Sequence, residues 1–104
     1  MVSAIAERRS ELATLCERFG VKRLEVFGSA ASDQGFDPDT SDLDFIVEFP
    51  AGHDLGPWLR EYFALREALA DLFGYPVDLV MSSAMRDPYF IREANRTRKL
   101  LYGA

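Results

Sequence analysis

Residues 24–48, LEVFGSAASDQGFDPDTSDLDFIVE, decide the fold of this chain. An apolar strand ends at Gly28-Ser29, an acidic loop follows, and a second apolar strand begins with Asp42 and Asp44. Side chains alternate along a strand, so these two carboxylates point to one face, with Cα atoms about 6.5–7 Å apart. Their oxygens can therefore ligate one hard divalent cation or a pair of them.

The Gly-Ser turn suits a bound phosphate. Gly28 tolerates a positive φ, and its missing Cβ lets a ligand approach the backbone. If Ser29 opens a short helix, the turn offers backbone N–H groups to a phosphate. Alone, such a turn is more often structural. Beside metal-binding carboxylates it indicates nucleotidyl transfer.

A third acidic residue lies on a separate predicted strand. Asp78 stands in the middle of Val77–Met81 and faces away from Val77 and Leu79. A charge in so apolar a strand is costly unless it is paired, hydrogen-bonded or bound to a metal. A salt bridge to an arginine explains Asp78 equally well when it is considered alone. Taken with the other two carboxylates, Asp78 favours a catalytic site.

Size and composition indicate one soluble globular domain spanning residues 1–104, with 48% hydrophobic and 28% charged residues. No apolar run is long enough to cross a membrane, and Glu7, Arg8 and Arg9 interrupt any signal peptide, so we expect a cytoplasmic protein without membrane contact. Cys16 is the only cysteine, and its place on the apolar side of a predicted helix favours a core residue over a nucleophile.

Negative charge is concentrated in one part of the chain. The formal net charge is −5, but residues 24–59 contain no Lys or Arg and carry −8, which leaves +3 elsewhere. Such a region repels a nucleic-acid backbone and attracts divalent cations, and through them a nucleoside triphosphate. We therefore expect no direct nucleic-acid binding. A solvated acidic loop is the simpler alternative, but it explains Asp42 and Asp44 poorly, because both lead into an apolar strand.

The apolar spacing and the Gly and Pro positions predict the remaining elements. Pro57 and Gly74 bound the clearest helix, whose apolar stripe, which includes Trp58, Leu59 and Phe63, we expect in the core. The predicted helices cover 3–19, 57–73 and 87 to about 101, and the predicted strands cover 21–27, 42–49 and 77–81.

The segments Val26-Phe27-Gly28-Ser29 and Ser41-Asp42-Leu43-Asp44 together resemble the Gly-Ser and Ser-Asp-x-Asp signature of the polymerase-β-like nucleotidyltransferases. The short, helix-flanked layout resembles the minimal nucleotidyltransferases of that superfamily, and the resemblance covers nearly the whole chain. It implies an α+β, two-layer fold in which a small mixed β-sheet has helices packed on one face.

The resemblance also implies roles for site residues. Asp42, Asp44 and Asp78 would hold two Mg²⁺ ions, and Gly28 and Ser29 would hold the β- and γ-phosphates of ATP. Asp78 would also help to deprotonate a hydroxyl that attacks the α-phosphorus in line, with pyrophosphate leaving.

This chain departs from the signature where many relatives carry basic residues. Ala30 and Ser32 occupy those places, and Asp33 stands where a glycine is expected. The loss of arginines weakens the expected hold on the triphosphate.

Many minimal nucleotidyltransferases are antitoxins encoded beside HEPN-domain ribonuclease toxins. A single domain that lacks an acceptor-binding domain favours an acceptor delivered by a partner protein. The resemblance thus implies an antitoxin that transfers AMP from ATP to a hydroxyl, that of a tyrosine, of a cognate HEPN toxin within a hetero-oligomer. The alternative is a non-catalytic antitoxin that neutralises its partner by direct complex formation. A small-molecule nucleotidyltransferase is disfavoured, because it would need an acceptor-binding domain.

Overall fold

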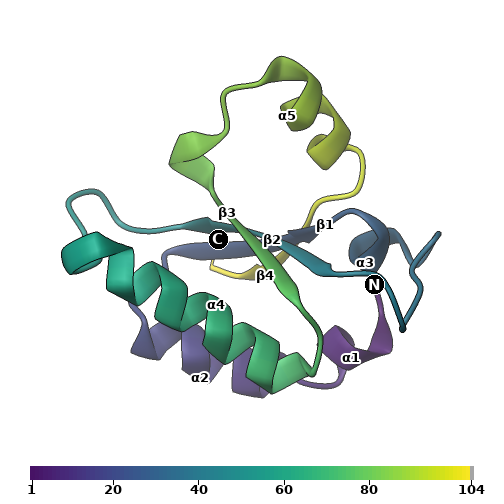
Figure 1. Cartoon of the computed structure of the whole chain (residues 1–104), viewed down its shortest axis with the longest axis horizontal. Helices are drawn as coiled ribbons and strands as arrows, with labels where there is room; N and C mark the ends of the chain where they lie inside the picture. The colour runs from purple at the N-terminus through teal and green to yellow at the C-terminus, as the bar shows by residue number, and fades with distance from the viewer. Residues whose placement is uncertain (104) are drawn as a thin grey trace.

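The computed structural model describes residues 1–103 and shows a four-stranded sheet with helices on both sides (Figure 1). In chain order the elements are α1 (Ser3–Ala6), α2 (Arg9–Arg18), β1 (Arg23–Phe27), α3 (Ser29–Ser32), β2 (Leu43–Glu48), η1 (Pro57–Leu59), α4 (Arg60–Phe73), β3 (Val77–Met81), η2 (Ser82–Ala84), α5 (Pro88–Asn95) and β4 (Lys99–Tyr102). Among the described residues, no helix is both long and apolar enough to cross a bilayer.

The sheet is mixed, with strand order β3-β2-β1-β4. β1 lies antiparallel to both β2 and β4, whereas β2 and β3 are parallel. Parallel neighbours need a crossover connection, and α4 provides it between β2 and β3. The two strands predicted to carry carboxylates are therefore adjacent and run in the same direction.

The main core lies between one face of the sheet and helices α1, α2 and α4, which lie below the sheet in Figure 1. Alternate residues of β1 and β2 point into it, as the period of a strand requires. Its fully buried members include Ile5, Leu12, Cys16, Leu24, Val26, Leu43, Phe45, Val47, Leu65 and Leu69. Cys16 is thus a core residue as predicted, and burial raises the pKa of its thiol to about 12.

A smaller apolar cluster lies on the other face of the sheet, under α5 (Figure 1). Phe27, Ile46 and Ala94 are buried there, and the rings of Phe27 and Phe90 meet edge to face with centroids 5.6 Å apart. The predicted α+β fold with a mixed sheet is confirmed. The prediction that the helices pack on one face is wrong for α5, because Phe27 and Ile46 give the opposite face an apolar patch that α5 covers.

The predicted final helix is wrong at its C-terminal end. Helix α5 stops at Asn95, and residues 99–102 form β4 instead. β4 pairs with β1, which would otherwise be an edge strand, and this pairing buries Leu101. Backbone pairing and burial outweigh the helix propensity of the two leucines in this segment.

The predicted first helix is interrupted at Glu7 and Arg8, which separates α1 from α2. Two contacts tie the N-terminus to the region of α3: the Val2 N–H donates to the Ala30 carbonyl, and the Met1 amino group lies 2.6 Å from the Asp33 carboxylate. The chain has to bend after α1 to satisfy these contacts and still pack α2 below the sheet.

The apolar stripe predicted for 57–73 is confirmed only from Arg60 onward. Pro57–Leu59 forms a separate 3₁₀ turn in which Trp58 and Leu59 have φ values of 57° and 56°. Trp58 is consequently 94% exposed, and Phe63 is also exposed. The prediction that Trp58 and Leu59 lie in the core is wrong, because the stripe assumed one continuous helix. It is also wrong for Phe63, which is exposed although it lies inside α4, so the buried stripe of α4 consists of Leu65, Leu69 and Phe73.

Candidate active site

Asp44 and Asp78 are direct neighbours across the parallel pair β2–β3. Paired residues on adjacent strands lie about 4.8 Å apart and point to the same face of the sheet. Asp42 precedes β2 by one residue, on the same side as Asp44 by strand alternation. The structure therefore places all three predicted carboxylates at one end of the face that α5 partly covers, and we call them the acidic cluster.

The members of the acidic cluster interact electrostatically. Burial, followed by the charges of Asp78 and Asp42, raises the pKa of Asp44 to about 6. Among the described residues, no ion pair joins any of the three carboxylates to a lysine, arginine or histidine. The arginine salt bridge considered for Asp78 is thus not formed within residues 1–103. Asp78 also avoids the expected burial cost, because β3 is an edge strand and its side chain is exposed.

Gly28 lies at the end of β1, next to the carboxylate of Asp44 in the acidic cluster. Phe27 pairs with Asp44, and Gly28 follows with φ 73° and ψ −153°. A methyl group placed on Gly28 would lie 2.7 Å from Oδ2 of Asp44, closer than non-bonded atoms approach. Only glycine combines this φ with this contact. Ser29 then begins α3, as the sequence suggested.

A hollow of about 480 Å³ adjoins Gly28 on the side of α5. Its lining residues are Phe27, Gly28, Phe90, Glu93, Ala94, Arg96 and Thr97. Thr97 also contacts the turn directly, because its Oγ1 accepts a hydrogen bond of 2.7 Å from the Gly28 N–H. Sequence reasoning missed Thr97, since it placed this residue inside a helix.

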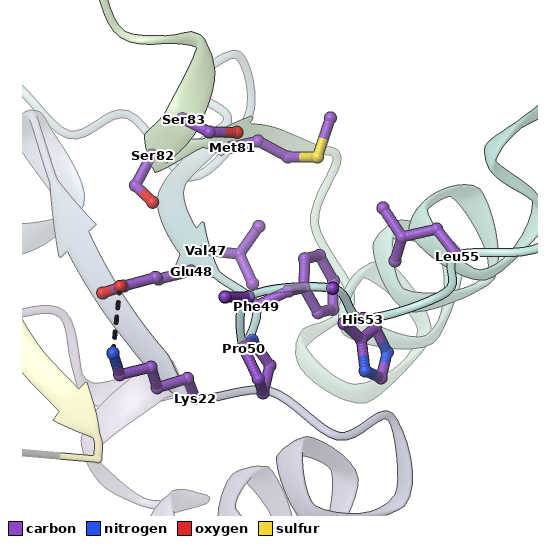
Figure 2. Close-up of a pocket in the computed structure, with 12 residues that line it drawn as sticks. Lys22, Val47, Glu48, Phe49, Pro50, His53, Leu55, Met81, Ser82 and Ser83 are labelled. Atoms are coloured by element: carbon purple, nitrogen blue, oxygen red, sulfur yellow. Dashed lines mark ion pairs between the residues drawn. The ribbon is translucent and has the colours of Figure 1, made fainter.

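Another hollow, of about 500 Å³, lies at the far end of β2 (Figure 2). Glu48, Phe49 and His53 line it, and Lys22 forms an ion pair of 3.4 Å with Glu48 at its rim. Glu48 is four residues beyond Asp44 on the strand, a separation of about 13 Å. This hollow is therefore separate from the acidic cluster.

The acidic cluster fits a hard divalent cation in its chemistry. Carboxylate oxygens are the ligands that Mg²⁺ prefers. A cation would offset the burial and the mutual repulsion that raise the pKa of Asp44. In their present rotamers, however, no three His, Cys, Asp or Glu side chains among residues 1–103 are gathered closely enough to hold an ion. The three carboxylates would therefore have to move closer together to share an ion.

The raised pKa of Asp44 predicts a pH-dependent effect of Asp44→Asn on stability. The folded protein binds a proton on Asp44 more tightly than the unfolded chain, so this residue favours folding below pH 3.8 and progressively opposes it up to about pH 6. Without added metal, the variant should match the wild type near pH 4 and exceed its unfolding free energy by roughly 1–3 kcal/mol at pH 7.

Urea denaturation of both proteins between pH 4 and 8 measures this difference. Asp71→Asn, on the exposed side of α4 below the sheet, removes the same charge away from the cluster and serves as the control. A constant difference between Asp44→Asn and wild type over this range would contradict the assigned pKa shift.

Comparison with known proteins places this geometry in context. The family model of the nucleotidyltransferase domain matches residues 10–101. The protein adenylyltransferase MntA of Thermococcus cleftensis is 40% identical over 72 residues, which are 69% of this chain and 67% of that protein. A solved structure provisionally named a minimal nucleotidyltransferase is 33% identical with a TM-score of 0.70, covering 91% of this chain and 90% of its own.

The fold also recurs in a toxin–antitoxin complex. The structure of a tri-AMPylated HEPN toxin of Shewanella oneidensis with its MNT antitoxin contains a chain that matches this one with a TM-score of 0.65 over 96% of this chain and 73% of that chain. The identity is 18%, so this likeness concerns the fold alone.

Proposed function

Because this chain belongs to the nucleotidyltransferase family and is a nucleotidyltransferase, we propose that it is a Mg²⁺-dependent protein adenylyltransferase that acts as an antitoxin. It transfers AMP from ATP to a hydroxyl, that of a tyrosine, on a cognate HEPN ribonuclease toxin. The observation that carries the proposal is the register pair Asp44–Asp78, which lies beside the Gly28 turn and, within residues 1–103, forms no ion pair with a lysine, arginine or histidine.

The relatives support the choice of reaction and partner. The similar protein of Thermococcus cleftensis is named a protein adenylyltransferase, and the fold recurs in an antitoxin bound to an AMPylated HEPN toxin. The face above β2 and β3 is exposed at Asp42 and Asp78, so a side chain of another protein can reach it. These observations favour a protein as the acceptor.

In the proposed reaction, Asp42, Asp44 and Asp78 would hold two Mg²⁺ ions, which would neutralise charge on the triphosphate and on the attacking and leaving oxygens. Gly28 and Ser29 would hold the β- and γ-phosphates, Gly28 through the close approach that its missing Cβ allows and Ser29 through hydrogen bonds to phosphate oxygens. The tyrosine oxygen forms a bond to the α-phosphorus while the bond from that phosphorus to the bridging oxygen of the β-phosphate breaks, and pyrophosphate leaves. Asp78 accepts the hydroxyl proton, since it is the exposed carboxylate beside Asp44.

The departures from the signature are accommodated in the structure. Ala30 is fully buried in the main core, so a basic residue at this place would not reach a phosphate without repacking. The Asp33 carboxylate is paired with the Met1 amino group, and this pairing reduces its repulsion of a triphosphate. Arg96, the residue after α5, lines the hollow beside Gly28, where it forms an ion pair of 3.2 Å with Glu93.

The test is a transfer assay with the protein encoded by the adjacent gene, Mg²⁺ and ATP labelled on the α-phosphate. We expect label on the partner and release of pyrophosphate, whereas ATP labelled on the γ-phosphate should leave the partner unlabelled. Replacement of the modified tyrosine by phenylalanine should abolish labelling. An unlabelled partner that is still neutralised by Asp44→Asn and Asp78→Asn would overturn the proposal.

The alternative is a non-catalytic antitoxin that covers the surface of its partner. This function is favoured by two observations: the three carboxylates of the acidic cluster do not form a metal-holding group among the described residues, and the Gly-Ser turn lacks basic residues. This function predicts a tight complex that forms without ATP, and neutralisation that is insensitive to both aspartate substitutions. Measuring complex formation with and without ATP distinguishes the two functions.

A further inference from the structure

Two residues at the junction of α5 and β4 contact the Gly-Ser turn and the helix α3 that follows it. Thr97 accepts a hydrogen bond from the Gly28 N–H, and Nζ of Lys99 donates to the Ala31 carbonyl at 2.9 Å. Arg98, between them, binds Glu25 on β1.

Both polar groups of the Gly28 backbone are engaged in the structure. Its N–H donates to Thr97, and its carbonyl accepts from the N–H groups of Ala31 and Ser32 in α3. The hydrogen bond to Thr97 fixes the peptide between Phe27 and Gly28, while α3 fixes the one that follows. The turn is thereby held at φ 73° against the carboxylate of Asp44.

Thr97 is itself held in place by strong contacts. The N–H groups of Thr97 and Arg98 both donate to the Ala94 carbonyl, which closes α5. The Arg98 guanidinium binds both oxygens of Glu25 at 2.9 and 2.6 Å, and the Glu25 side chain is only 7% exposed. Bidentate pairs of this kind fix orientation as well as distance. The Thr97 hydroxyl is therefore positioned before any ligand arrives.

We propose that Thr97 is a positioning residue for the nucleotide: its hydroxyl holds the Gly28 peptide so that the Gly-Ser turn receives a nucleoside triphosphate without reorganising. This inference rests on the proposed nucleotidyltransferase site and adds to it a residue that lies outside both signature segments. The hydroxyl acts through Gly28 and does not touch the reacting atoms. It thus affects binding of the nucleotide rather than the chemical step.

The test compares Thr97→Val, which keeps the shape but removes the hydroxyl, with Thr97→Ser, which keeps the hydroxyl. Calorimetric titration with AMP-PNP and Mg²⁺ should show an affinity about threefold to tenfold lower for Thr97→Val, as expected for one hydrogen bond, and within about twofold of wild type for Thr97→Ser. In the transfer assay, KM for ATP should rise by the same factor with kcat nearly unchanged. The Gly28 amide proton should exchange faster in Thr97→Val.

Thr14→Val is the matched control, because Thr14 is exposed on α2, across the sheet, and donates only to the Ser10 carbonyl. Equal affinities of wild type and Thr97→Val would overturn the inference, and so would equal losses in Thr97→Ser and Thr97→Val. If the wild type binds no AMP-PNP and transfers no AMP, the proposed function itself fails, and the inference fails with it. Thermal unfolding of each variant separates a loss of affinity from a loss of fold.

Discussion

Asparagine in place of Asp44 is expected to lower the rate of AMP transfer at least about a thousandfold, because a metal-bound site contributes several kcal/mol of transition-state stabilisation. Asp44 is the central member of the acidic cluster, since its pKa responds to both Asp78 and Asp42. Asp78→Asn should act in the same direction. Initial rates of label transfer from ATP to the partner, at saturating Mg²⁺, provide the measurement.

The control for both variants is Asp71→Asn, which changes the same group on the exposed side of α4, below the sheet. It should transfer AMP at the wild-type rate. The Asp44→Asn variant should meanwhile remain folded and, near pH 7, be more stable than the wild type without metal. Loss of activity with a gain of stability would identify Asp44 as a residue retained for chemistry at a cost to folding. Transfer at a rate within tenfold of wild type would contradict its assignment.

Methionine in place of Arg98 is expected to lower the free energy of unfolding by about 3 kcal/mol at pH 7, because it leaves a buried carboxylate without its main partner. Glu25 is the only charged residue among those classed as buried in the described chain, and Arg98 makes two hydrogen bonds to it. Arg23, at 3.5 Å, compensates in part. Urea denaturation followed by circular dichroism measures the loss.

Lowering the pH should reduce the loss of unfolding free energy caused by Arg98→Met. Hydrogen bonds from Arg98 lower the pKa of Glu25, so the stability that the pair contributes is present above the usual pKa of a glutamate and is lost as the pH falls through the lowered value. The difference between Arg98→Met and wild type should therefore shrink towards pH 3. Arg8→Met, which removes an exposed ion pair with Glu11 at 3.7 Å, should cost under about 1 kcal/mol. A similar loss in both variants would contradict the role assigned to burial.

Much of the fold follows from local patterns in the sequence. Val77–Met81 forms a strand with the predicted ends, and β2 lies within its predicted range, because alternation and turn residues agree there with the tertiary structure. Gly28 has the positive φ expected of it, and the parallel pairing of β2 with β3 brings Asp44 next to Asp78. The acidic cluster was predictable because strand periodicity fixes the direction of each carboxylate.

The elements that sequence reasoning missed depend on contacts between distant residues. β4 consists largely of residues that also favour helices, and it becomes a strand only because β1 offers an edge to pair with. Once β4 was assigned to a helix, the partnership of Arg98 with Glu25 and that of Thr97 with Gly28 could not be anticipated. The exposure of Trp58 was also missed, since the change of backbone conformation at Trp58 and Leu59 redirects the side chains without altering the apolar pattern.

The contact between Gly28 and Asp44 links two positions that are far apart in the sequence. The carboxylate occupies the space that any other residue at position 28 would need for its first side-chain carbon. Any side chain at position 28 would displace the Asp44 carboxylate and would be strained at φ 73°, so a library that varies position 28 alone is expected to lose activity at most substitutions. Alanine at both positions removes the collision but keeps the unfavourable φ, so even a paired substitution would restore the shape only in part.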